Sequence, residues 1–115
     1  MTHEPAVNFR VELTADANSD LLALAGYVAD RHTIAQAEYV VSKIEVVVEK
    51  LAVYPERGVY PPELLALGIK DFRPVLFKPY RVIYRLLDRR VVVHLIADGR
   101  RDLQALLNER LLSQP

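Results

Sequence analysis

The chain has 115 residues, of which 51% are hydrophobic and 26% are charged, a composition that fits one folded domain over residues 1–115 and excludes an intrinsically disordered chain. Its net charge of zero divides into −5 over residues 1–69 and +5 over residues 70–115. Most cations of the second half are arginines, which suit carboxylates and phosphates and indicate an anionic partner. The alternative is that the two halves attract each other within the fold. It has no cysteine, no apolar run near the roughly 20 residues that span a bilayer and no signal-peptide pattern, so we expect a cytoplasmic protein with no disulfide and no membrane partner.

Two patterns at the start of the chain predict a strand followed by a helix. Residues 7–14 alternate between apolar and polar side chains, which is the period of a strand with one solvent-facing side. From Asp16 onward the apolar residues recur at helical spacing, and we expect this helix to end near residues 30–32. Its apolar stripe consists of Leu21, Leu24, Ala25 and Val28.

A second helix is expected directly after the first. Thr33 and Gln36 have the spacing of a capping box, in which the two side chains satisfy backbone N–H groups at a helix start. Pro55 should end the helical region. We therefore expect an antiparallel helical hairpin. The apolar stripe of its second helix consists of Ala37, Val40, Val41, Ile44, Val47, Val48 and Leu51.

The rest of the chain predicts the sheet that the hairpin needs to cover. Residues 62–67 are expected to form a short helical turn, and residues 88–90 a tight turn between the last two strands. The three predicted strands cover residues 71–77, 80–87 and 91–97. A turn at Asp98-Gly99 and a final short helix follow, with Leu103, Leu106, Leu107, Arg110 and Leu111 at helical spacing. The predicted fold class is α+β: an N-terminal strand, an antiparallel helical hairpin, a three-stranded antiparallel meander and a short C-terminal helix.

The residues that usually carry metal or cofactor chemistry are sparse. His3, His32 and His94 do not have the spacing of a shared metal site, so no metal is expected. The four glycines form no phosphate-binding loop, and no serine-hydrolase elbow or paired-carboxylate spacing occurs, so no cofactor is expected. We interpret His94 as a core or sheet-face histidine bonded to a neighbour, with a catalytic base as the alternative.

Arginines on a predicted strand and after the last strand are the strongest candidates for a binding site. Arg81 and Arg85 share one face of their strand, and Tyr80 and Tyr84 share the other. Arginines interleaved with aromatic residues can bind RNA, but we interpret the tyrosines as core residues and leave the role of the arginines open. In the segment Gly99–Asp102, two adjacent arginines at a strand-to-helix turn can both face outward toward an anion.

Four short segments carry a resemblance to a known family. They are the helix end and turn at residues 51–58, Phe72-Arg73, the sequence PYRVIY at residues 79–84, and residues 99–102 ahead of Leu106-Leu107. In this order they make the chain similar to the RelE/ParE superfamily of toxins from type II toxin–antitoxin systems, over residues 7–112. The resemblance implies a compact antiparallel sheet with a helical hairpin packed on it. It also implies a cognate antitoxin, ParD-like or similar, whose segment wraps around the toxin in a hetero-oligomer.

The RelE-like branch of the superfamily implies a ribosome-dependent mRNA endonuclease, with the ribosome and mRNA as partners. Such members use cations to stabilise charge on the phosphate, and often a C-terminal tyrosine or histidine. Here the resemblance assigns the cations to Arg73, Lys78, Arg81 and Arg101. The place of the tyrosine is taken by Leu106 or Leu107, which cannot transfer a proton.

The ParE-like branch implies a poison of DNA gyrase that acts by protein binding and has no catalytic residues. The chain is more similar to this branch because of its long helical hairpin, the sequence GRRD at residues 99–102 and its aliphatic C-terminal helix. The residues that the resemblance assigns to the target are Arg100, Arg101 and Asp102. One departure is Asp98, which stands where many relatives have a histidine.

For the antitoxin we expect an apolar groove between the sheet and the helices, edged by basic residues, that binds an acidic segment. The residues expected to bind the antitoxin are Arg73, Arg81 and Arg85.

Three hypotheses about the function of the chain result. The favoured one is a gyrase poison, the second is a ribosome-dependent endonuclease, and the third is a degenerate toxin that retains only antitoxin binding.

Overall fold

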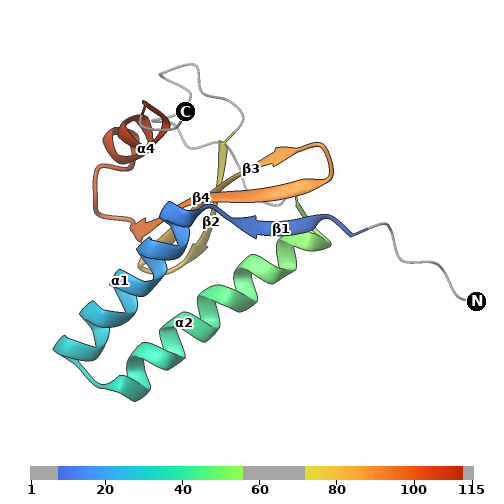
Figure 1. Cartoon of the computed structure of the whole chain (residues 1–115). Coiled ribbons are helices and arrows are strands. Elements are labelled where there is room, and N and C mark those ends of the chain that lie inside the picture. The colour runs from blue at the N-terminus through green and yellow to red at the C-terminus, as the bar shows by residue number, and fades with distance from the viewer. Residues whose placement is uncertain (1–7, 56–71, 113–115) are drawn as a thin grey trace, which may run out of the picture.

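The computed structural model describes residues 8–55 and 72–112 (Figure 1). Their elements are β1 (Arg10–Leu13), α1 (Ala15–Arg31), α2 (Ile34–Glu49), the 3-10 turn η1 (Lys50–Ala52), β2 (Phe72–Phe77), β3 (Tyr80–Leu87), β4 (Arg90–Asp98) and α4 (Leu103–Leu112). The predicted α+β class and order of elements are confirmed, and the helical turn expected at residues 62–67 lies outside the described residues. None of the helices described is long and apolar enough to cross a membrane.

The four described strands form one sheet in the order β1-β4-β3-β2. β1 pairs in parallel with β4, whereas β2, β3 and β4 form the predicted antiparallel meander. The strand predicted over residues 7–14 is too long at both ends. The backbone N–H of Phe9 donates to the carbonyl of Ala52 in η1, and Thr14 is the N-cap of α1.

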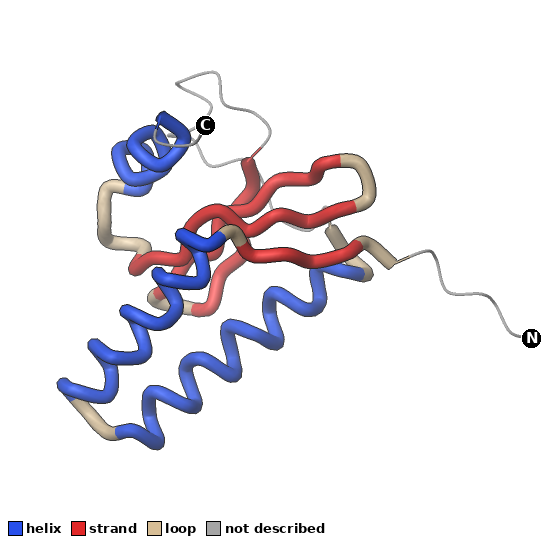
Figure 2. Tube along the Cα trace, viewed as in Figure 1, coloured by secondary structure: helices blue, strands red, loops and turns tan. Residues whose placement is uncertain are grey.

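The helices α1 and α2 form the predicted antiparallel hairpin, and a threonine caps each of them. The hydroxyl of Thr14 accepts from the N–H of Ala17, and that of Thr33 from the N–H of Gln36, each at 3.0 Å. Both hydroxyls satisfy N–H groups that have no partner within the helix. Figure 2 shows the two helices running side by side, with α4 apart from them.

The sheet separates two hydrophobic cores. Sheet residues on one face pack against the hairpin, and Leu103 and Leu107 of α4 pack on the other. β3 alternates as the sequence predicts, because Val82 and Tyr84 belong to the hairpin core and Ile83 to the α4 core. Each fully buried leucine or isoleucine contributes roughly 2 kcal/mol to folding. Most of the predicted stripe of α2 lies in the hairpin core, whose members from this stripe are Val40, Ile44, Val48 and Leu51, and Ala37 is also buried.

His94 is an extra residue on β4. Because Ile83 pairs with Leu95 and Tyr84 with Val93, His94 has no partner on β3 and forms a β-bulge. Its buried ring packs edge-on against Phe72, with 5.3 Å between the ring centroids. The prediction of a core histidine is confirmed, but the expected bond to a neighbour is not found, since neither ring nitrogen has a hydrogen-bond partner among the described residues. Burial, together with the charges of Arg85 and Arg110, lowers the pKa of His94 to about 4.

Candidate functional site

The turn between β4 and α4 is held in a defined shape by backbone and side-chain hydrogen bonds. The N–H of Gly99 donates to the carbonyl of Pro79 at 2.7 Å, which fixes this turn against the turn between β2 and β3. A Cβ atom on Gly99 would lie 3.1 Å from that carbonyl oxygen, so only glycine fits here without displacement. The carboxylate of Asp102 accepts from the N–H of Ala105 at 3.0 Å and caps α4.

Asp98 and Arg100 form a clamp within this turn. The Asp98 carboxylate accepts from Nε of Arg100 at 3.0 Å, from Nη2 at 2.8 Å, and from the Arg100 backbone N–H at 2.8 Å. The two side-chain bonds are the paired geometry in which a guanidinium binds a carboxylate. The side-chain and backbone hydrogen bonds from Arg100 lower the pKa of Asp98, so the carboxylate is ionised near neutral pH.

Arg101 differs from its neighbour. Its side chain is exposed, and within the described ranges it has no hydrogen-bond or ion-pair partner. Arg100 is also exposed, at 85% of its side-chain surface, but its guanidinium is bound to Asp98. Both arginines therefore reach solvent as predicted, and of the two only Arg101 is without an ion pair among the described residues.

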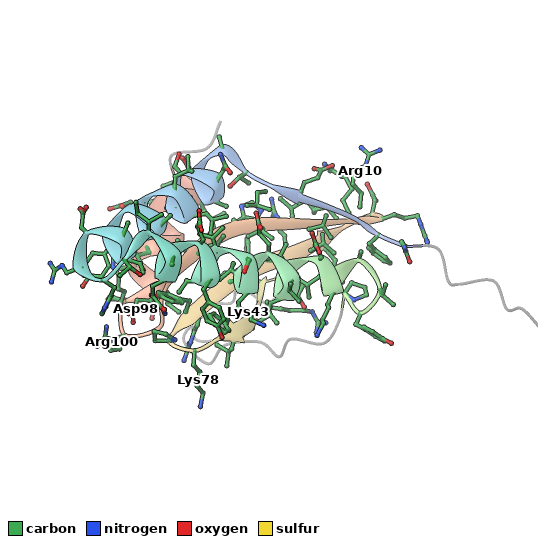
Figure 3. All side chains as sticks on the ribbon, turned by 90° about the horizontal axis from the view of Figure 1, so that it is seen from below. Arg10, Lys43, Lys78, Asp98 and Arg100 are labelled. Carbon is green, nitrogen blue, oxygen red and sulfur yellow. The ribbon has the colours of Figure 1, made fainter. Side chains whose placement is uncertain are left out.

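A groove of about 440 Å³ opens beside this turn. One wall is the outer face of α1, and the other is formed by the first residue of β3 and the last residues of β4. Arg100 and Arg101 stand at its edge, and Figure 3 shows Asp98 and Arg100 at the opposite end of the molecule from Arg10. The lining residues are Asp20, Ala23, Leu24, Tyr27, Tyr80, Ile96, Ala97, Asp98, Arg100 and Arg101. A groove of this size with mixed walls can hold one or two side chains of a partner.

Two tyrosines give the groove a second kind of polar group. Tyr27 of α1 is 56% exposed, and the guanidinium of Arg31 lies 4.7 Å from its ring centroid. Tyr80 is half-buried, and burial together with the charge of Asp98 raises the pKa of Tyr80 above its ordinary value. The Tyr80 phenol is therefore a neutral hydrogen-bond donor near pH 7.

A second groove between the sheet and the helices has acidic residues on its lining. It has a volume of about 330 Å³ and lies between β1, α1 and α2. Its lining includes Glu45 and Glu49 and, in the described part of the chain, no arginine or lysine. The expected groove with a basic edge corresponds instead to the one beside the β4–α4 turn, where α1 faces the sheet and the basic residues are Arg100 and Arg101. Arg73, Arg81 and Arg85, the residues expected to bind the antitoxin, are not among the described lining residues of either groove.

The structure divides the other predicted site residues between the two faces of the sheet. Arg85 of β3 lies opposite Phe72 of β2, and its guanidinium lies over the Phe72 ring on the α4 side of the sheet. Arg81 lies on the same face of β3. Arg73 pairs with Tyr84 and faces the hairpin. Arg81 also lies beside Gly99, and Lys78 is exposed in the nearby turn between β2 and β3. Arg81, Lys78 and Arg101 therefore share one end of the sheet, from which Arg73 is separated.

The sequence does not predict two residues that line this groove, Asp20 and Tyr27, as site residues. Asp20 looks like an ordinary surface residue of an amphipathic helix, yet its carboxylate binds Arg110 of α4 at 2.7 Å. The position of Arg110 within an apolar leucine stripe is the feature that could have indicated a buried ion pair. Tyr27 carries no comparable pattern. The described residues contain no group of three or more metal-binding side chains.

Two solved structures with a similar arrangement of elements come from toxin–antitoxin systems. The chromosomal ParDE system from P. aeruginosa includes a chain that is similar with a TM-score of 0.68 and 17% identity, over 81% of this chain and 98% of that one. The RelBE2 toxin–antitoxin complex from Mycobacterium tuberculosis includes a chain with a TM-score of 0.60 and 19% identity, over 80% and 99% of the two chains. No curated protein gives a significant sequence match. These similarities show that the chain shares its fold with chains from both systems.

A match to a family model shows which family the chain belongs to. Residues 11–103 match the family described as "ParE toxin of type II toxin-antitoxin system, parDE". The chain belongs to this ParE toxin family. The sequence prediction of the RelE/ParE superfamily, closer to its ParE-like branch, is confirmed.

Proposed function

We propose that the chain is a toxin that inhibits DNA gyrase by protein binding and is neutralised by a cognate antitoxin. The observation that carries the proposal is the unpaired, exposed Arg101 beside the Asp98–Arg100 clamp, at the edge of a groove. Such a surface binds an anionic group of a partner through charge-assisted hydrogen bonds. The target-binding residues proposed are Arg100, Arg101 and Asp102.

Inhibition by binding, without catalysis, agrees with the chemistry of the described residues. The positions where a proton donor is expected hold Leu106 and Leu107, and Leu107 is fully buried. His94 is buried and neutral near pH 7, because its pKa is about 4. We therefore propose a non-enzymatic poison that acts in the cytoplasm, where gyrase is found.

The proposed antitoxin is ParD-like and forms a hetero-oligomer with the toxin. Its proposed contacts are Arg73, Arg81 and Arg85. Similar chains occur in a ParDE system and in the RelBE2 complex, which supports a partner of this kind. Because Arg73 faces the hairpin and the other two face α4, a segment that contacts all three must pass around β2, the outer strand of the described sheet.

A gyrase supercoiling assay with purified protein tests this function. We expect the wild-type chain to inhibit supercoiling or trap cleaved DNA, and the antitoxin encoded by the adjacent gene to relieve the effect. The double variant Arg100→Gln/Arg101→Gln should need at least about tenfold more protein, because each lost charge-assisted bond contributes roughly 1.5 kcal/mol. Arg10→Gln/Arg90→Gln is the matched control, since both residues are exposed at the opposite end of the sheet. Absence of inhibition by folded wild-type protein contradicts the proposal.

A second candidate function is ribosome-dependent cleavage of mRNA. The observation that favours this function is that Arg81, Lys78 and Arg101 lie at the same end of the sheet. The phenols of Tyr27 and Tyr80 are near this end. Cations in such a cluster could stabilise a phosphate during cleavage. Toeprinting on translating ribosomes distinguishes the candidates, because an endonuclease cuts in the ribosomal A site and a gyrase poison leaves the message intact. A chain that is inactive in both assays but binds the antitoxin is the degenerate toxin.

A further inference from the structure

The charges around the 440 Å³ groove are already arranged as carboxylate–arginine pairs, with one cation left over. Asp20 is bound to Arg110, and Asp98 is bound to Arg100. Arg101 is the remaining cation on the lining, and its side chain has no partner in the described part of the chain. The edge formed by Asp98, Arg100 and Arg101 therefore has one more positive than negative charge.

The Asp98–Arg100 pair is held locally and is open to exchange. The two residues are separated by only one other residue, and the Arg100 side chain is 85% exposed whereas that of Asp98 is 22% exposed. Ion pairs with this much solvent contact contribute little to stability, because water replaces the lost partner at small cost. A carboxylate from another molecule could bind Arg100 with the same two-bond geometry.

We propose that the groove binds an acidic segment of the cognate antitoxin, and that Asp98 occupies the place of the incoming carboxylate in the free toxin. This inference rests on the proposed toxin–antitoxin function. In the complex, an antitoxin aspartate or glutamate binds Arg101 and competes with Asp98 for Arg100. Asp98 thus lowers the affinity of the toxin for its antitoxin and limits binding to segments with enough negative charge.

The walls of the groove define the rest of the partner segment. Ala23, Leu24 and Tyr27 present an apolar and aromatic surface from successive turns of α1, and Tyr27 is 56% exposed. A residue next to the antitoxin carboxylate can bury an apolar side chain against this wall. The expected segment therefore combines an acidic residue with a large apolar one.

Because Arg100 and Arg101 are also the residues proposed to bind gyrase, antitoxin and gyrase cannot bind this surface together.

Calorimetric titration of the full-length toxin with purified antitoxin tests the role of Asp98. Asp98→Asn keeps an oxygen that can accept the backbone N–H of Arg100 but removes the charge that holds the guanidinium. We expect this variant to bind antitoxin about fivefold more tightly than the wild type, because an exposed pair contributes up to about 1 kcal/mol. Asp88→Asn is the control, since Asp88 is exposed in the distant β3–β4 turn and asparagine tolerates its positive φ of 56°.

The groove itself is tested by two further variants. Arg101→Gln should weaken binding about tenfold and reduce its dependence on salt, whereas Arg10→Gln should leave the affinity unchanged. Tyr27→Ser should also weaken binding, and its exposed position makes it a test that does not depend on the turn. The proposal is overturned if folded Asp98→Asn binds no more tightly than Asp88→Asn, or if Arg101→Gln and Tyr27→Ser both bind like the wild type. If all groove variants bind with wild-type affinity, the groove is not the antitoxin site, but the proposed toxin–antitoxin function stands. If the wild type binds no antitoxin, both the groove proposal and the proposed function are contradicted.

Discussion

Asp20 of α1 and Arg110 of α4, ninety residues apart, form a two-bond ion pair across the edge of β4. Nη1 of Arg110 donates to Oδ2 of Asp20 at 2.7 Å and Nη2 to Oδ1 at 3.1 Å. Beyond the end of β1, each partner also satisfies a backbone group of β4. Arg110 donates to the carbonyl of His94 at 2.7 Å, and Asp20 accepts from the N–H of Ile96 at 3.0 Å. The pair thus replaces the hydrogen bonds that a longer β1 would make, and it joins α1, β4 and α4.

Replacing Arg110 with methionine should therefore destabilise the protein strongly. Only 16% and 17% of the two side chains are exposed, so the variant leaves a mostly buried carboxylate without its counter-charge. Removal of one partner of a buried pair costs about 3 kcal/mol or more. Urea denaturation should show this loss in the free energy of unfolding.

The exposed pair of Arg90 and Glu12 is the matched control for this variant. Nη1 of Arg90 lies 3.2 Å from the Glu12 carboxylate, and the two side chains are 45% and 34% exposed. Arg90→Met should cost less than about 1 kcal/mol, because surface ion pairs are screened by water. Equal losses in the two variants would show that the Asp20–Arg110 pair does not hold α4 on the sheet.

Most of the fold follows from local patterns in the sequence. Alternation and helical periodicity predict the strands and helices, and Thr33 marks the start of α2 because its hydroxyl satisfies the N–H of Gln36. The apolar stripe of α2 is buried as predicted, since a stripe of that width must be removed from water. Parallel pairing of β1 with β4 depends on contacts between distant segments, and the strand pattern alone does not predict it.

Only part of the candidate site follows from the sequence. The sequence predicts Arg100 and Arg101 as candidate site residues because two arginines follow a strand at a turn. Their different roles depend on the bond from Arg100 to Asp98, which needs the turn geometry fixed by Gly99 and Pro79. The groove also needs α1 to lie beside the end of β4, and this is a relationship between segments more than fifty residues apart. The separation of Arg73 from Arg81 does follow from strand alternation, since their pairing partners face opposite cores.

The stability of the protein should fall as the pH decreases from about 6.5 to about 4, through the titration of His94. The pKa of this residue is about 4 in the folded chain, compared with 6.5 in an unfolded one, because burial and the nearby Arg85 and Arg110 oppose its charge. The unfolded chain therefore takes up a proton first, and the folded state loses roughly 3 kcal/mol over this range.

His94→Leu provides the comparison for this pH effect. Leucine fills a similar volume against Phe72 and does not titrate, so the difference in unfolding free energy between variant and wild type should change with pH between 6.5 and 4. Other groups titrate in both proteins and cancel in the difference. A difference that stays constant over this range would mean that His94 is protonated equally in the folded and unfolded chains.

Alanine substitutions at two glycines should have opposite effects on stability. In Gly99→Ala, the new Cβ would lie 3.1 Å from the Pro79 carbonyl oxygen and 3.3 Å from Nε of Arg81, so one of the two turns must shift. We expect a loss of about 1–2 kcal/mol and weaker antitoxin binding. In Gly26→Ala, nothing lies within 4 Å of the new atom, and alanine favours the exposed interior of α1 by up to about 1 kcal/mol. Thermal unfolding of both variants tests the pair, and stabilisation by Gly99→Ala would contradict the tight approach of the turns.

Charge reversal on the two faces of the sheet tests whether the antitoxin wraps around the toxin. Arg73 lies on the hairpin side and Arg81 on the α4 side of the β2–β3 pair, so one flat interface cannot contact both. We expect both Arg73→Glu and Arg81→Glu to weaken antitoxin binding about tenfold or more in a titration, with Arg10→Glu as the surface control. Because the two arginines lie on opposite faces of the sheet, the effects should add in the double variant. If only one reversal weakens binding while both proteins remain folded, the antitoxin occupies a single face and does not pass around β2.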